Sequence, residues 1–289
     1  MVSFLYSRSD IEFAVVTQRT IRDAIYGYRS TIEFCNLLGI EFYVPDFLDA
    51  NFLMLAKKIN PDLIICAYYP QIFPKELLDL PPLGCINVHP GCLPKYRGTF
   101  PTPWHILNNE KEIGITLHYM DKNIDTGDII FQKKYPIYDY ETGHQLYMRT
   151  MKLSGEIIIE SFDKILSRDV RPVRQDIGGS YFNYIEARYQ INWSMARQDI
   201  VNRIRVHSPP YFPAYTFIFN KCITIERAKI FNVDGYNAQR PGVIYRVNDN
   251  STFLVSAADG LILIEDYQIT PLVTKEEHCL HIMVGNHFE

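Results

Sequence analysis

Residues 62–89 read DLIICAYYPQIFPKELLDLPPLGCINVH, and their pattern indicates the fold class. The two ends of this stretch, 62–67 and 85–89, are short apolar runs of the kind that form buried strands. Between them, residues 74–80 predict a short helix. A strand, a helix and a second strand in this order make up the repeating unit of a parallel sheet. We therefore predict an α/β fold.

The same alternation of strand and helix patterns extends in both directions from this stretch. It covers residues 1–185, which we predict to form one domain with a doubly wound, mainly parallel sheet. The other expected strands and helices are strands at 12–17, 41–44, 115–120 and 128–135, and helices at 27–38, 50–59, 102–109 and 142–166.

The pattern changes near residue 185. Residues 186–207 predict a linker helix, and residues 208–289 predict a small antiparallel β domain of barrel-like form. Turn dipeptides separate the strand patterns of this second domain. These strand patterns cover 216–220, 222–231, 243–247, 252–257 and 261–269.

Composition and charge exclude several classes of protein. Of the 289 residues, 47% are hydrophobic and 21% are charged, as in ordinary globular domains. No apolar run approaches the roughly 18–20 residues that a membrane span needs, and no signal-peptide pattern opens the sequence. The six cysteines form no CxxC pair. A formal net charge of −4 offers no general attraction for nucleic acid or anionic lipid. We therefore expect a cytoplasmic protein with reduced thiols and no membrane partner.

Three polar side chains are the candidates for chemistry. Asn87 and His89 stand two apart in a predicted strand, so both project from the same face near its carboxyl end. Asp125 lies in the loop after the strand predicted at 115–120. Alone, Asn87 is equally well explained as a turn residue, and His89 as a histidine satisfied within the core. Together, an amide, an imidazole and a carboxylate can stabilise an oxyanion, move a proton and hold the imidazole charged.

The sequence contains, in this order, the motifs GCINVHP (84–90), LPKYRG (93–98), GITLH (114–118), DTGDI (125–129), INW (191–193), RPGV (240–243) and ADGL (258–261). Together they resemble the motifs of the N10-formyltetrahydrofolate-dependent formyltransferases. The resemblance covers nearly the whole chain, and it implies a Rossmann-like domain followed by an OB-like domain. It also implies that Asn87, His89 and Asp125 are catalytic, with N10-formyltetrahydrofolate as co-substrate and no metal. In this interpretation Asp125 raises the pKa of His89.

The resemblance also suggests which residues bind the two substrates. Tyr96 and Arg97 are expected to shape the active-site loop and the acceptor site. For Arg97, contact with a diphosphate and a surface ion pair are equally good interpretations. Thr99 stands where the sugar branch of the family has an arginine near the folate. The remaining expected folate contacts are Gln71, Ile72, Phe73, Asp121, Lys122, Asn123 and Ile124.

Within the family, the sugar-nucleotide N-formyltransferases are the most similar branch, through AYYP (67–70), LPKYRG and GSYF (179–182). The implied acceptor is a dTDP- or UDP-linked amino sugar of lipopolysaccharide or O-antigen assembly. The segment after Thr17 is short and mixed in charge, whereas the methionyl-tRNA branch carries a basic loop, so nucleic acid is not the expected partner. For the oligomeric state, a homodimer is the default expectation.

Three alternatives stay open at this point. The chain is a methionyl-tRNA formyltransferase in the first, and a deformylase that uses water as acceptor in the second. In the third it is an inactive, truncated paralogue, because the sequence opens on what resembles the family's first helix and the first strand of the sheet is expected to be missing.

Overall fold

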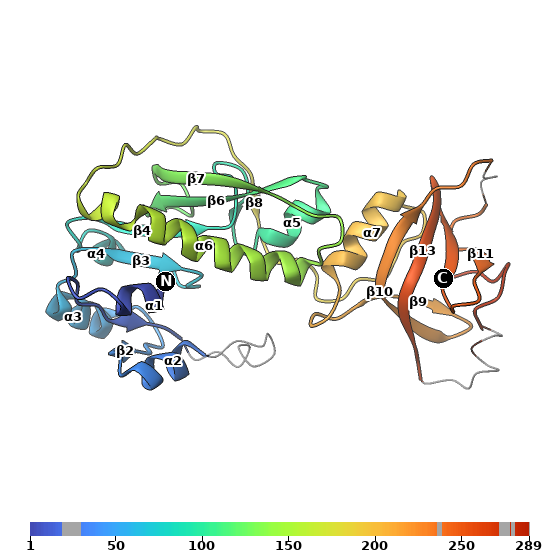
Figure 1. The fold of residues 1–289 in the computed structure, drawn as a ribbon, viewed down its shortest axis with the longest axis horizontal. Helices are drawn as coiled ribbons and strands as arrows, with labels where there is room; N and C mark the ends of the chain where they lie inside the picture. Colours follow the sequence, from blue (N-terminus) through green and yellow to red (C-terminus); the bar gives the residue numbers. More distant parts are fainter. Residues whose placement is uncertain (19–29, 236–238, 272–277, 279–280, 289) are drawn as a thin grey trace. The chain divides into compact units, whose positions relative to one another are not determined.

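The computed structural model describes residues 1–18, 30–235, 239–271, 278 and 281–288 (Figure 1). The chain divides into two compact units, which are described separately. The first unit consists of residues 1–101, 113–135 and 149–183. The second consists of residues 102–112, 136–148 and 184–289.

A four-stranded sheet forms the centre of the first unit. Its order is β3 (Ile64–Ala67), β4 (Cys85–His89), β6 (Glu112–Tyr119) and β7 (Ile129–Pro136). β3 and β4 are parallel, and β4 and β6 are antiparallel, with Asn87 opposite His118. The α/β fold predicted from the sequence is therefore confirmed, and the antiparallel β6 places its polar residues directly beside those of β4.

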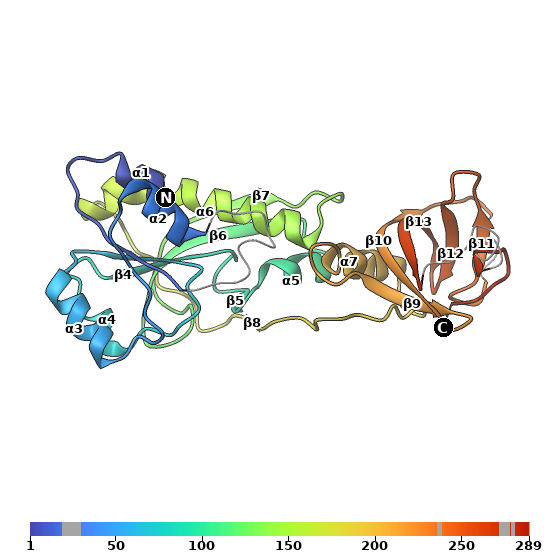
Figure 2. The same cartoon turned by 90° about the horizontal axis from the view of Figure 1, so that it is seen from below.

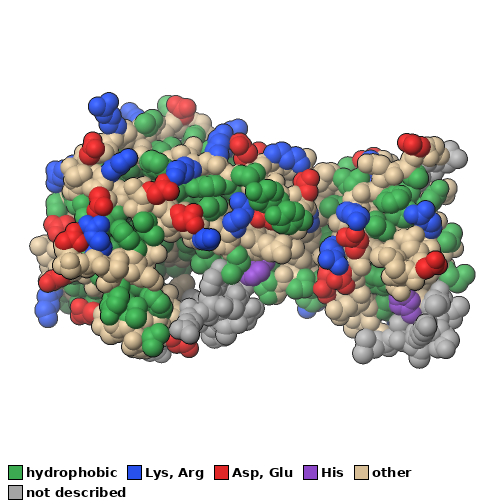
Figure 3. Space-filling model, viewed as in Figure 1, with side chains coloured by type: hydrophobic (Ala, Val, Ile, Leu, Met, Phe, Trp, Pro, Cys, Tyr) green, Lys and Arg blue, Asp and Glu red, His purple; other side chains and the backbone are tan. Residues whose placement is uncertain are grey.

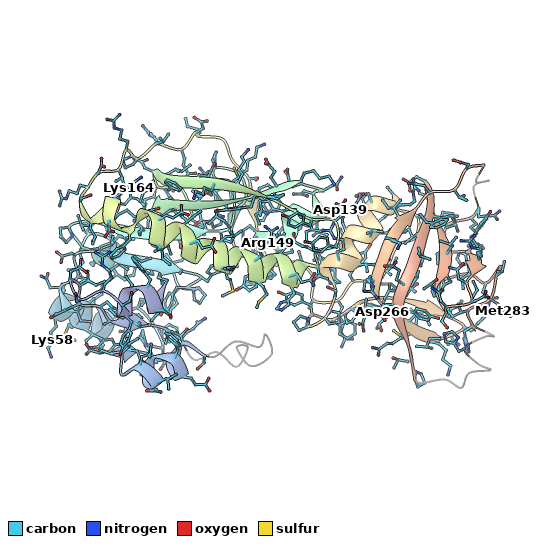
Figure 4. All side chains as sticks on the ribbon, in the orientation of Figure 1. Lys58, Asp139, Arg149, Lys164, Asp266 and Met283 are labelled. Atoms are coloured by element: carbon cyan, nitrogen blue, oxygen red, sulfur yellow. The ribbon has the colours of Figure 1, made fainter. Side chains whose placement is uncertain are left out.

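Helices cover this sheet on both sides. On one side α6 (Gly143–Leu166) packs Ile157 and Ile158 against the apolar side chains of β4 and β6. On the other, α3 (Ala50–Ile59) and α4 (Lys75–Leu78) form a separate apolar cluster. Figure 2 shows α6 and the α3–α4 pair on opposite sides of β4. Lys164 lies in the last turn of α6, where a cation complements the helix dipole (Figure 4).

The first strands form a small sheet of their own. β1 (Val15–Val16) pairs in parallel with β2 (Phe42–Tyr43), and β3 is the edge strand of the four-stranded sheet. α1 (Val2–Tyr6) precedes β1. α2 (Thr31–Leu38) begins with a capping box and ends at a left-handed glycine, so its C-terminal end agrees with the sequence pattern.

The second unit is built around a five-stranded antiparallel sheet that matches the expected strands closely. α7 (Arg197–Val206) packs against this sheet. The predicted linker helix over 186–207 is therefore shorter than expected, and its apolar stripe belongs to the core of the second unit. Trp193 lies before α7, and its indole N–H donates to Thr216 Oγ1 at 3.1 Å. The strand order is β11 (Ile244–Val247), β12 (Phe253–Ala257), β13 (Gly260–Thr270), β10 (Lys221–Phe231) and β9 (Ala214–Ile218).

Two short elements complete the described chain. β5 (Arg97–Gly98) pairs in parallel with β8 (Tyr181–Phe182) within the first unit, and α5 (Thr102–Leu107) belongs to the second unit. None of the helices in the described ranges is long and apolar enough to cross a membrane.

Candidate active site

The carboxyl end of β4 supplies the first two residues of the site. Asn87 and His89 alternate with Val88, which packs into the core cluster beneath α6. His89 is buried, with 4% of its surface exposed. Strand alternation thus sends the polar pair to one face and the apolar residue to the other, as the sequence predicts.

Asp125 reaches the same place from the loop between β6 and β7. Its Oδ1 accepts from Asn87 Nδ2 at 3.3 Å, and its Oδ2 lies 3.5 Å from His89 Nδ1. The backbone N–H of Gly98 donates to Oδ2 at 2.9 Å. The structure therefore brings together the three residues that the sequence singles out.

Gly127 explains how the loop comes so close to β6. A Cβ atom at this position would lie 1.9 Å from the carbonyl oxygen of Tyr119, so no residue other than glycine fits. Asp125 precedes Gly127 by two residues in the loop that makes this close approach.

His118 is a fourth member of the cluster, and sequence reasoning missed it. Its Nδ1 lies 2.7 Å from the carbonyl oxygen of Tyr119, which can only accept. In the neutral ring Nε2 is therefore the acceptor, and it faces Asn87 Nδ2 at 3.2 Å and Asp125 Oδ1 at 3.5 Å. The motif GITLH contains this residue, but only the register of β6 on β4 shows that it stands opposite Asn87.

The charges in the cluster differ from the sequence expectation in one respect. Burial opposes ionisation of Asp125, but the imidazoles of His118 and His89 and the Gly98 amide lower its pKa to about 2. For His89, burial lowers the pKa below its usual value, and the attraction of Asp125 and the bond to Tyr96 offset this only in part. Asp125 thus raises the pKa of His89 as expected, but burial outweighs this attraction, so the net pKa of His89 lies below its usual value. At neutral pH, His89 is uncharged.

The hydrogen bonds of His89 define its tautomer. Nε2 lies 2.6 Å from the carbonyl oxygen of Tyr96, so this nitrogen carries the hydrogen and donates. The lone pair of neutral His89 is then on Nδ1, facing the Asp125 carboxylate. A proton taken up by Nδ1 would lie beside a negative charge. This geometry suits a general base whose charged form is stabilised as it appears.

The two residues expected at the acceptor site are both buried. Tyr96 stacks on Phe182 with ring centroids 4.9 Å apart, and it contributes its carbonyl oxygen to His89. Arg97 has 4% of its surface exposed and bonds to the Asp125 carbonyl and to Gln175. The interpretation of Arg97 as a surface ion pair is therefore wrong. Its contact with a diphosphate stays a prediction.

The expected folate residues fall into two groups. Asp121 and Asn123 line a polar cavity of about 450 Å³, together with Arg97 and Gln175. Asp121 accepts from the Thr126 hydroxyl at 2.7 Å, which shapes this loop. Neighbouring Lys122 and Ile124 are exposed.

The second group lies in the segment after β3, apart from Thr99, which is exposed after β5. Gln71 Oε1 accepts a hydrogen bond of 3.1 Å from the Leu48 N–H and so links this segment to the loop before α3. Phe73 packs edge-on against Tyr69, and Ile72 is 75% exposed. The folate role of both groups stays a prediction.

Comparison with known families and relatives shows which family the chain belongs to. The Formyl transferase model matches residues 45–162, and the model of the formyl transferase C-terminal domain matches residues 185–272. The methionyl-tRNA formyltransferase of Syntrophus aciditrophicus (strain SB) is 36% identical over 230 residues, which are 78% of this chain and 72% of that protein. The chain belongs to the formyl transferase family, and it is a formyltransferase.

Solved structures extend the comparison. WlaRD, a sugar 3N-formyltransferase whose structure was solved with dTDP and 5-N-formyl-THF, is 25% identical with a TM-score of 0.66. The alignment covers 90% of this chain and 88% of that one. An N-formyltransferase from Helicobacter canadensis, in complex with folinic acid and dTDP-3-aminofucose, is 21% identical with a TM-score of 0.65. The alignment covers 89% of this chain and all of that one, so the two proteins share the fold.

Proposed function

We propose that this formyltransferase moves a formyl group from N10-formyltetrahydrofolate to the amine of a dTDP- or UDP-linked amino sugar. The observation that carries this proposal is the cluster of buried His89 with partly buried Asn87 and Asp125 at the carboxyl end of β4. A neutral imidazole beside an ionised carboxylate is the arrangement that transfer to an amine requires, because the attacking nitrogen must lose a proton.

Each residue of the cluster has a separate task in this reaction. The amine attacks the formyl carbon, and His89 Nδ1 takes its proton while Asp125 stabilises the imidazolium. His89 then returns the proton to N10 as this nitrogen leaves. In the free protein the Asn87 amide donates to His118 Nε2 and to Asp125 Oδ1. The longer bond, to Asp125, is exchanged for the formyl oxygen when negative charge develops there.

The choice of acceptor rests on charge and on the structural comparison. The net charge of −4 gives no general attraction for tRNA. On the visible face of the first unit, basic and acidic side chains are interspersed (Figure 3). The likeness to WlaRD extends over 90% of the chain, through both units. The segment after Thr17 was expected to lack a basic loop, but its residues 19–29 lie outside the described residues.

Methionyl-tRNA is the second candidate acceptor. It is supported by the names of relatives in the sequence comparison, such as the 36% identical protein of Syntrophus aciditrophicus. This identity exceeds the 25% shared with the sugar enzyme. The two candidates differ in size and charge, so one assay separates them.

The test supplies N10-formyltetrahydrofolate with a panel of dTDP- and UDP-linked amino sugars, and separately with charged initiator methionyl-tRNA. Release of tetrahydrofolate is followed for the wild type and for His89→Ala. We expect turnover with at least one sugar, none with tRNA, and loss of activity in the variant.

The other outcomes would contradict this proposal in different ways. Turnover with tRNA alone would move the assignment to the second candidate. Equal release of formate with and without acceptor would indicate a deformylase. Soluble, folded protein that turns over no acceptor would indicate an inactive paralogue.

A further inference from the structure

The backbone of Asp125 is held in an unusual conformation. Its φ is +54°, in the left-handed region that residues with a side chain rarely adopt. Its carbonyl oxygen accepts two hydrogen bonds from buried side chains, Arg97 Nε at 3.1 Å and Gln175 Nε2 at 3.0 Å. The residue that carries the carboxylate is therefore fixed through its peptide group as well as through its side chain.

Both the nitrogen and the oxygen of the Gln175 side-chain amide form hydrogen bonds beside Asp125. Nε2 donates to the carbonyl oxygens of Asp125 and Gly127, at 3.0 and 2.7 Å. Oε1 accepts from Arg97 Nε at 3.2 Å and from Arg97 Nη2 at 2.7 Å. Only a primary amide of this length supplies donors to two carbonyls and an acceptor to a guanidinium at once.

The segment that presents Gln175 is itself anchored. Two residues earlier, Val173 exchanges a pair of backbone hydrogen bonds of 2.8 Å with Ile129, at the start of β7. The support therefore rests on the sheet on which the site is built. Gln175 is also buried, with 9% of its surface exposed, so its bonds compete little with water.

The backbone contacts are shorter than the side-chain contacts that they support. The Asp125 carboxylate lies 3.3 Å from Asn87 Nδ2 and 3.5 Å from His89 Nδ1. Gln175 Nε2 lies 2.7 Å from the Gly127 carbonyl oxygen and 3.0 Å from the Asp125 carbonyl oxygen. We propose that Gln175 is a positioning residue: it bridges Arg97 to the Asp125–Gly127 backbone and so keeps the Asp125 carboxylate against His89. This inference rests on the proposed function, in which Asp125 stabilises the charged form of His89.

The test compares Gln175→Glu with Gln190→Glu. Glutamate at 175 keeps the length and the contact with Arg97, but it turns an acceptor oxygen toward the two carbonyl oxygens of the loop. Gln190 is exposed, so the same chemical change there is the matched control. We expect kcat to fall at least tenfold in Gln175→Glu, with both KM values within about twofold of wild type. Gln190→Glu should match the wild type.

Two results would overturn the proposal. One is a folded Gln175→Glu protein with kcat within twofold of the wild type. The other is an unchanged kcat with a raised KM for either substrate, because that would make Gln175 a binding residue. If Gln175→Glu does not fold, Gln175→Asn keeps the amide but is shorter by one methylene, and its kcat is judged against the same limits.

A second measurement needs no substrate. NMR titration of the His89 ring is compared in the wild type and in Gln175→Met, which removes all four bonds without adding charge. Asp125 raises the pKa of His89, and burial and His118 lower it. Moving the carboxylate away should therefore lower the pKa of His89 further. An unchanged pKa would overturn the proposal, even if the wild type transfers no formyl group and the proposed function fails.

Discussion

At the scale of the residue, hydrogen-bond partners fix which ring nitrogen of each histidine in the site carries the hydrogen. Carbonyl oxygens at Tyr96 and Tyr119 assign the hydrogen of His89 to Nε2 and that of His118 to Nδ1. The remaining nitrogens face Asp125. Asn87, His89 and Asp125 could be predicted from the sequence because they end or follow strands. His118 and Gln175 could not, because their roles depend on strand register and on a segment far along the chain.

The pH dependence of stability should reveal Asp125. Its pKa falls from the ordinary 3.8 to about 2 in the folded protein, so the folded state favours the ionised form. This stabilisation is fully present above about pH 4 and is lost as the pH falls toward 2. It amounts to on the order of 2 kcal/mol. Denaturant unfolding at pH 6 and pH 3 should show a smaller loss of stability for Asp125→Asn than for the wild type. Parallel losses would contradict this account of the carboxylate.

At the scale of the element, most of the fold follows from local sequence patterns. α3, for example, spans the predicted range 50–59, and β4 the predicted range 85–89. The helix expected at 186–207 starts only at Arg197. Ile191 and Trp193 are apolar because they enter the core of the β sheet, and periodicity alone does not separate this from a helix face.

We expect catalysis to depend on the loop between β6 and β7, because this loop carries Asp125. Gly127→Ala would force a Cβ atom against the Tyr119 carbonyl oxygen, so the loop must shift and carry Asp125 with it. We expect kcat to fall at least tenfold, and the free energy of unfolding to fall by roughly 1–3 kcal/mol. Gly178→Ala is the control, because a Cβ there meets nothing within 4 Å. Steady-state kinetics with chemical denaturation measures both effects. Wild-type kcat in Gly127→Ala would contradict the role of the loop.

At the scale of the whole molecule, the chain is organised less simply than the sequence predicts. Residues 102–112 and 136–148 belong with the second unit, although they lie within the range 1–185 predicted as one domain. Local patterns predict where strands and helices lie, but not which distant elements they contact. The same limit applies to the acceptor, because an amide, an imidazole and a carboxylate do not by themselves distinguish one amine from another.

In the proposed mechanism, His89 moves the proton and Asp125 acts through His89. A double-mutant cycle with His89→Ala, Asp125→Asn and the double variant tests it most directly, in single-turnover formyl transfer to the accepted substrate. Each single change should lower the rate by roughly 10²–10⁴-fold. The double variant should be no more than a few-fold slower than the slower single variant, because the two residues act as a unit. Losses that multiply in the double variant would contradict this mechanism.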